Sequence, residues 1–230
     1  MINNIILFFR ILLSTQSTKF ALLLCINLQL WCKPMTKPFS QACENNKKPI
    51  LAQLKKVFKS SRSVLEVGSG TGQHSVFFAE QLPHLQWYTS DRAINHEGIR
   101  LWHAQVSLNN LHAPLTLDLS HDWPIDKVDA IFTANTFHII SWQLVERFFD
   151  GVKRHLNNEG MLCIYGPFKY QGKFTSPSND DFNTFLIDRD PLSGIRDFEA
   201  VEGLAKQAGL SLISDTAMPA NNQLLVFKRQ

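Results

Sequence analysis

Three glycines spaced two apart, Gly68, Gly70 and Gly72, are the residues of this 230-residue chain best suited to hold a small ligand. The apolar and β-branched run Val64–Val67 precedes them, and a helical pattern of apolar residues follows from Val76. A strand, a glycine turn and a helix let a ligand approach bare backbone and meet unpaired N–H groups at the helix start. The stretch predicts a nucleotide-type binding turn.

Two carboxylates flank this turn. Asp91 lies nineteen residues beyond Gly72, the separation at which an acid accepts hydrogen bonds from both hydroxyls of a ribose. An aspartate in a surface turn would have the same spacing, but the glycine loop favours ribose binding. Glu66 precedes the loop on an expected buried strand, where a carboxylate is costly unless it is satisfied. Glu66 therefore either orders the loop or helps to hold a cationic ligand.

The spacing of the glycines separates two kinds of ligand. The dinucleotide fingerprint GxGxxG holds a pyrophosphate, and here its third glycine position is occupied by Gln73. The glycine comes one residue early, at Gly72. A nicotinamide-dependent oxidoreductase is therefore the less favoured alternative.

From Met35 onward the apolar patterns alternate between strand and helix, which predicts an α/β fold with a doubly wound, mostly parallel sheet. The last two strands have no helix between them and should pair antiparallel. Strands are expected near residues 63–67, 85–89, 113–117, 128–133, 161–165, 210–214 and 223–228. Ligands bind beyond the carboxyl ends of the strands in such sheets.

Proline, serine and turn-forming residues predict where helices begin and where turns occur. Pro49 suits the first turn of a helix, and the polar residues 38–46 are expected to form a loop or a loose first turn. Ser141 is expected to cap a helix, and Asn157–Gly160 to form a turn. Residues 166–196 read as an irregular, lid-like insertion with one short helix after Ser178.

Two side chains at strand ends could remove a proton from a substrate. His138 follows the fourth expected strand and Tyr165 ends the fifth, and both are candidate catalytic residues. A structural histidine and an aromatic ring packed over a ligand are the alternatives. His74 begins a helix and could cap it or line the pocket.

The insertion 166–196 and the turn 218–222 should face the same opening of the expected ligand site. Residues 40–48 should close the other side of that site. Alternatively, the asparagine side chains in these segments hydrogen-bond to the backbone of their own turns. The candidate substrate-lid residues are Glu44, Asn45, Asn179, Arg196, Asn221 and Asn222.

The net charge of +3 belongs to residues 1–34, which hold Arg10, Lys19 and Lys33 and no acid. The rest of the chain is neutral overall, so nothing favours a nucleic-acid partner. The two apolar blocks of this leader, residues 5–13 and 20–31, are shorter than a spanning helix. An over-extended gene model starting properly at Met35 is the favoured interpretation, and a signal or membrane anchor or an extra helix are the alternatives. Residues 35–230 then form one domain, with no stable membrane association unless the leader is real.

None of the four cysteines has a metal-ligand or disulfide-framework spacing. This favours reduced cysteines, a cytoplasmic protein and no metal site.

Three segments resemble the first three motifs of class I S-adenosylmethionine-dependent methyltransferases: Leu65–Gly72, Ser90–Asp91 and Leu117–Leu119. The chain is most similar to the methyltransferase-like protein 26 family, catalogued as a domain of unknown function. This closer resemblance runs from about Met35 to the C-terminus. It is carried by Ser40–Ile50, Gly70–His74, Val128–Phe132, Tyr165–Phe168, Pro177–Asn179 and Met218–Asn222.

The resemblance implies a seven-stranded sheet of order 3-2-1-4-5-7-6 with strand 7 antiparallel, and S-adenosylmethionine as cofactor. The glycine loop would lie against its methionine part, Asp91 would bind the ribose, and Asp118 the adenine amino group. Leu119 would pack on the adenine, and Asn135 would line the site where the sulfonium faces the substrate. The expected cofactor-binding residues are Glu66, Gly68, Ser69, Gly70, Gly72, His74, Asp91, Asp118, Leu119 and Asn135.

The expected function is in-line methyl transfer to a small or medium-sized molecule. No proline follows Asn135, unlike the string after strand four in methyltransferases that act on nucleic acid bases. The alternative from another class is a non-catalytic S-adenosylmethionine-binding subunit that acts through a protein partner.

Overall fold

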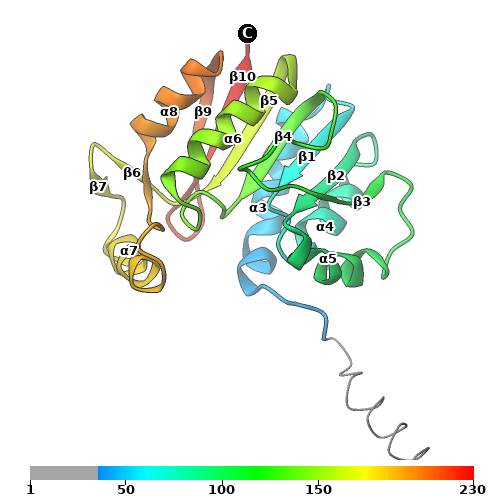
Figure 1. Cartoon of the computed structure of the whole chain (residues 1–230), viewed down its shortest axis with the longest axis horizontal. Coiled ribbons are helices and arrows are strands. Elements are labelled where there is room, and N and C mark those ends of the chain that lie inside the picture. Colours follow the sequence, from blue (N-terminus) through cyan, green and yellow to red (C-terminus); the bar gives the residue numbers. More distant parts are fainter. Residues whose placement is uncertain (1–35) are drawn as a thin grey trace, which may run out of the picture. The chain divides into compact units, whose positions relative to one another are not determined.

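A sheet of seven strands forms the centre of the computed structural model, which describes residues 36–230 (Figure 1). Its strands are β1 (Ser63–Val67), β2 (Gln86–Asp91), β3 (Leu111–Thr116), β4 (Val128–Ala134), β5 (Leu156–Gly166), β9 (Leu210–Met218) and β10 (Asn222–Arg229). Their order is β3-β2-β1-β4-β5-β10-β9, which confirms the expected order. β10 runs antiparallel to both of its neighbours, β5 and β9.

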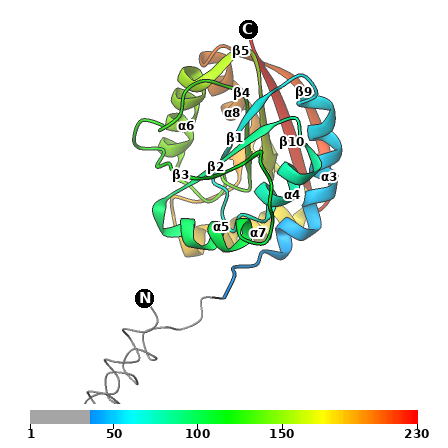
Figure 2. The same ribbon diagram turned by 90° about the vertical axis from the view of Figure 1, so that its right-hand side faces the viewer.

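Helices cover both faces of this sheet, as Figure 2 shows. The helices of the layers are α3 (Gln41–Val57), α4 (Gln73–Gln81), α5 (His96–His103), α6 (Trp142–His155) and α8 (Phe198–Gln207). Alternate residues of β1 feed the two cores: Leu65 and Val67 join the core under α6 and α8, whereas Val64 joins the core under α3 and α4. The sheet is therefore rigidly packed on both sides, and its strand ends are fixed.

The insertion 166–196 is more ordered than the sequence predicts. It contains β6 (Phe168–Tyr170), β7 (Lys173–Phe174) and the whole of α7 (Pro177–Arg189). Together with β8 (Arg196–Asp197), the two strands form a second sheet of order β7-β6-β8. The helix begins earlier than expected because the Ser176 side chain accepts a hydrogen bond from the Asn179 N–H and Pro177 occupies the first turn.

Residues 41–46 form regular helix where a loop or a loose first turn was expected, and only residues 38–40 lie outside it. Helix α3 begins at Gln41, with the Ser40 hydroxyl accepting from the Cys43 N–H at 3.3 Å. Pro49 lies inside the helix, where it cannot donate the usual hydrogen bond to the Asn45 carbonyl. Helix capping, rather than apolar periodicity, therefore sets the start of α3.

The expected turn at Asn157–Gly160 is part of strand β5. Val128 pairs with Leu156, but Ala130 pairs with Met161, so the intervening residues bulge out of the ladder. Glu159 has a positive φ of 62° within this bulge. Turn-forming residues thus mark an irregularity in the strand.

Residues 38–230 form one compact unit. In the described part of the chain, no helix combines the length and apolarity needed to cross a membrane. The expectations for the leader, residues 1–34, lie outside the described residues.

Candidate functional site

A cavity of about 1040 Å³ lies beyond the carboxyl ends of the parallel strands, which is large for a ligand site. Its walls come from the β1–α4 loop, the ends of β2 to β5 and the β9–β10 turn. The first turns of α3 and part of α7 complete it. The strand ends that the sequence analysis singled out therefore meet in one site.

The glycines of the β1–α4 loop adopt positive φ angles of 76°, 59° and 88° at Gly68, Gly70 and Gly72. A Cβ on Gly72 would lie 3.0 Å from the Ile99 Cα, so this glycine lets the loop pack on α5. A Cβ on Gly70 would meet nothing within 4 Å. Gly68, Ser69 and Gly70 line the cavity, whereas Gly72 does not.

The Asp91 carboxylate joins the end of β2 to this loop. Its Oδ2 accepts from the Gly70 N–H at 2.7 Å, and its Oδ1 accepts from the Arg92 N–H at 2.7 Å and Asn95 Nδ2 at 2.8 Å. A carboxylate has about four acceptor positions. Asp91 is therefore held in place at the cavity wall with acceptor capacity left for a ligand hydroxyl.

Asp118 and Leu119 line the cavity after β3. The Oδ1 atom of Asp118 accepts from the Ser120 hydroxyl at 2.6 Å and from the Ser120 N–H at 2.9 Å. These bonds lower the pKa of the Asp118 carboxyl. Its Oδ2 atom receives no hydrogen bond from residues 36–230, so it can accept from a ligand. Asn135 also lines the cavity, with a positive φ of 57°.

Glu66 does not line the cavity, which corrects the expected ligand contact. Its side chain is buried on β1, where Oε2 accepts from Trp87 Nε1 at 2.9 Å. Burial raises the pKa of the Glu66 carboxyl to about 7. The backbone carbonyl of Glu66 accepts from the Ser90 hydroxyl at 2.7 Å. Glu66 therefore supports the loop from beneath.

His138 and Tyr165 both line the cavity and are almost fully buried. The His138 ring packs edge-on against Phe182, with 5.4 Å between centroids, and its nitrogens have no hydrogen-bond partner within the described residues. Burial, helped by the charge of Arg196, lowers the pKa of His138 to about 4. Burial raises the pKa of the Tyr165 hydroxyl, and the neighbouring Asn46 side chain acts in the opposite direction.

Asn46 is a site residue that the sequence analysis missed. It is buried, lines the cavity, and its Oδ1 lies 2.7 Å from Nε2 of His74. Burial lowers the pKa of His74 to about 4. Asn46 thus lies between His74 on α4 and Tyr165 on β5, and the signals for it were the helix cap at Ser40 and the resemblance over Ser40–Ile50.

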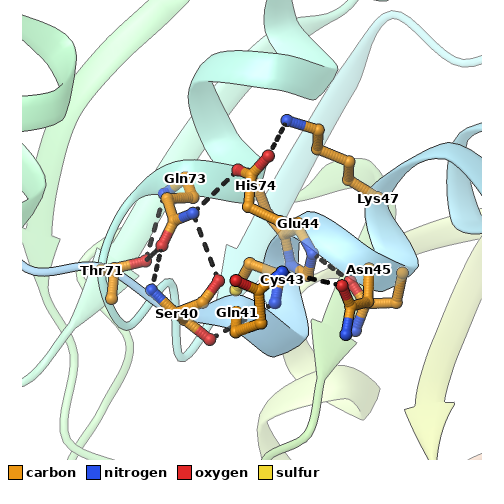
Figure 3. A network of polar contacts seen from close by, with 10 residues as sticks. Ser40, Gln41, Cys43, Glu44, Asn45, Lys47, Thr71, Gln73 and His74 are labelled. Atoms are coloured by element: carbon orange, nitrogen blue, oxygen red, sulfur yellow. Dashed lines mark hydrogen bonds and ion pairs between the residues drawn. The ribbon is translucent and has the colours of Figure 1, made fainter.

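Gln73 fastens the first turn of α3 to the glycine loop, as Figure 3 shows. Its Oε1 accepts from the Ser40 N–H at 2.5 Å and from the Thr71 hydroxyl at 3.1 Å, while its Nε2 donates to Glu44 Oε1 at 2.9 Å. Glu44 also pairs with Lys47. Ser40, Glu44, Thr71 and Gln73 thus form a hydrogen-bonded cluster, the α3 clasp. Glu44 lies outside the cavity lining, whereas Asn45 is in the lining.

The remaining lid candidates divide into two groups. Asn179 and Asn222 line the cavity. Asn179 Nδ2 donates to the Asn221 carbonyl at 3.0 Å, and Asn221 Nδ2 to the Ser178 hydroxyl at 3.1 Å, so Asn221 joins α7 to the β9–β10 turn from outside the lining.

Arg196 does not reach the cavity, contrary to expectation. Its guanidinium donates to the backbone carbonyls of Phe137, Ile140 and Leu192. Arg196 is therefore a structural tie between β8 and the β4–α6 loop. No group of three or more His, Cys, Asp or Glu side chains suited to a metal ion occurs among residues 36–230.

Solved structures of methyltransferases share this fold. An O-methyltransferase family protein from Burkholderia thailandensis is 15% identical, with a TM-score of 0.71 over 80% of this chain and 56% of its own. Human N-acetylserotonin methyltransferase in complex with SAM is 10% identical, with a TM-score of 0.70 over 82% of this chain and 53% of its own. The mitomycin 7-O-methyltransferase MmcR is 15% identical, with a TM-score of 0.68 over 78% of this chain and 53% of its own. The chain spans a little more than half the length of these enzymes.

The likeness defines a methyltransferase fold. A family model described as "Protein of unknown function (DUF938)" matches residues 37–229, and the chain belongs to this family.

Proposed function

We propose that this protein is an S-adenosylmethionine-dependent methyltransferase acting on a small or medium-sized molecule. The observation that carries the proposal is the 2.7 Å bond from the Gly70 N–H to Asp91 Oδ2. It joins a carboxylate suited to binding a ribose to an open glycine turn, at the cavity of a methyltransferase fold. The resemblance of Leu65–Gly72, Ser90–Asp91 and Leu117–Leu119 to the motifs of class I methyltransferases supports the same activity.

The residues present fit the cofactor. Spare acceptor capacity on Asp91 suits a ribose hydroxyl, and the free Oδ2 of Asp118 suits the adenine amino group. Leu119 offers an apolar contact to the adenine, and the bare backbone at Gly70 leaves room for the methionine part. S-adenosylmethionine supplies a sulfonium methyl group, so this chain need only align an acceptor and exclude water from it.

His138 is the residue we assign to remove a proton, where the acceptor carries one. Its nitrogens have no hydrogen-bond partner among residues 36–230. Burial and the charge of Arg196 lower its pKa to about 4, so the neutral ring offers a weakly basic nitrogen at the cavity wall. Tyr165 stays protonated at pH 7 because burial raises its pKa. Tyr165 therefore acts as a hydrogen-bond donor and His138 as the acceptor.

Calorimetric titration with S-adenosylhomocysteine tests the proposal. The wild-type protein should bind it, and Asp91→Ala should weaken binding at least about tenfold, because a charge-assisted hydrogen bond is lost. Asp122→Ala is the matched control, since that carboxylate pairs with Arg154 outside the cavity. No binding to the wild type, or tight NADH binding in its place, would refute the proposed function.

A further inference from the structure

All but one of the charged side chains in the cavity lining lie on one side of the glycine loop. Asp91 ends β2, Arg92 follows it and Asp118 follows β3. This is the side proposed to hold the adenosine. The opposite side is built by the ends of β4 and β5, the β9–β10 turn and α7. Its only charged lining residue is Asp190, which is exposed. The half of the cavity left for an acceptor therefore has almost no charge.

Cationic groups near this half are either neutralised or turned away. Burial keeps His74 and His138 uncharged at neutral pH by lowering the pKa of each to about 4. Lys47 pairs with Glu44 in the α3 clasp. Arg189 lies over the ring of Phe185, with 5.5 Å to the centroid, and is outside the lining. The Arg196 guanidinium donates to the backbone carbonyls of Phe137, Ile140 and Leu192 and lies outside the lining. None of these cations is therefore placed to pair with a carboxylate or phosphate in this half.

The walls of this half are apolar, with neutral amides between them. Ile140, Leu144 and Phe182 supply the apolar surface, while Asn46 and Asn179 supply hydrogen-bonding groups. An unpaired charge moved from water into such a site loses its hydration without compensation. A neutral molecule gains from burying its apolar surface and still finds partners for a polar group.

We propose that the methyl acceptor is an uncharged molecule with an apolar body and a hydrogen-bonding group, bound between α7 and the ends of β4 and β5. This inference rests on the proposed function, because it assigns the other half of the cavity to the cofactor. Carboxylates, phosphate esters and ammonium compounds of the same size are selected against.

Three probes of one size and different charge test the inference: 4-hydroxybenzyl alcohol, 4-hydroxybenzoate and tyramine. Their dissociation constants are measured by ligand-observed NMR at pH 7.5, on the full chain saturated with S-adenosylhomocysteine. The neutral alcohol should bind about tenfold or more tightly than the anion and the cation, because of the desolvation cost of an unpaired charge.

Introducing a cation supplies an independent readout. Ile139 lines the cavity and is 56% exposed, so Ile139→Arg should be accepted by the fold and should improve binding of 4-hydroxybenzoate several-fold. Ile213→Arg is the matched control, because Ile213 on β9 is 57% exposed and lies outside the lining. That variant should leave all three dissociation constants unchanged.

Tighter binding of the anion or the cation by the wild type would overturn the inference, as would failure of the neutral probe to bind at millimolar concentration. An equal gain from Ile213→Arg and Ile139→Arg would also contradict it, because the effect would then not arise in the cavity. The proposed function is tested separately by the binding of S-adenosylhomocysteine itself. Its failure shows in that titration before any probe is added.

Discussion

Gly70 has the backbone and surroundings of a residue that makes room for a ligand. Its φ is 59°, and an added Cβ would meet no protein atom within 4 Å. Gly172, in the turn between β6 and β7, has a similar φ of 73° and equally open surroundings. The two glycines therefore share the same backbone constraint, and only Gly70 lines the cavity.

Replacing Gly70 with alanine should separate ligand binding from backbone strain. Gly70→Ala and Gly172→Ala should each lower the free energy of unfolding by about 1–2 kcal/mol, the cost of a left-handed residue with a Cβ. Only Gly70→Ala should weaken binding of S-adenosylhomocysteine, by about tenfold or more, because its methyl group fills space in the cavity. Urea unfolding and calorimetry measure the two effects, and equal affinities of the two variants would contradict the assignment.

For single residues, the sequence predicts which ones reach the cavity when their position at a strand end decides their surroundings. Asp91, Asp118 and His138 follow strand ends and reach the cavity as expected. The direction of a long side chain is not encoded in its position, and Arg196 turns to backbone carbonyls instead. Asn46 was missed because its partner His74 lies on another helix.

At the level of elements, the clasp between α3 and α4 holds one wall of the cavity. Gln73 is 2% exposed and bonds to Ser40, Glu44 and Thr71. Gln73→Ala leaves the Ser40 N–H and the Thr71 hydroxyl without this partner, which should cost about 1–3 kcal/mol. Hydrogen exchange in residues 41–46 should become faster.

Gln41→Ala is the control for this prediction. Gln41 lies on the same turn, but its side chain donates to Asn45 Oδ1 at the surface and makes no bond to Gln73. Its exchange pattern should match that of the wild type. Unchanged exchange in Gln73→Ala would show that α3 is held by its apolar face alone, through Ile50 and Leu54.

Elements with a strong apolar period are predicted well, and those set by capping or by tertiary contacts are not. Helix α6 begins after Ser141 as expected, with that hydroxyl accepting from the Leu144 N–H. The start of α3 was misplaced because its polar first turn has no apolar face. Strands β7 and β8 have two residues each, which is too short for any period to show.

For the whole molecule, buried neutral histidines make stability depend on pH. The folded-state pKa of His74 and of His138 is lowered to about 4 by burial, below the ordinary value of about 6.5. The unfolded chain therefore binds more protons, and stability is lost as the pH falls from about 6.5 to 4. Each histidine contributes up to about 3 kcal/mol to this loss.

Glu66 acts in the opposite direction, since its raised pKa of about 7 favours the folded state as the pH falls from 7 towards 4.5. The variant His74→Gln/His138→Gln should therefore lose less stability than the wild type between pH 7 and pH 4.5. Urea unfolding at the two pH values measures this difference. If the variant and the wild type lost the same stability between the two pH values, these histidines would not control stability in acid.

The architecture of the molecule was predictable because strand and helix alternate along it, and the resemblance supplied the sheet order that the structure confirms. The cavity also follows from this topology, because strand ends converge at one edge of a parallel sheet. What a cavity accepts depends on side chains that meet only in the folded state, including the lining supplied by α7.

A crystal structure of the protein grown with saturating S-adenosylhomocysteine shows directly whether the cavity binds the cofactor at the glycine loop. We expect electron density for the adenosine between Asp91 and Leu119, with the ribose hydroxyls at the Asp91 carboxylate and the amino-acid part along Gly68–Gly70. Density for the ligand elsewhere, or an empty cavity at a concentration that saturates the protein in solution, would contradict the account.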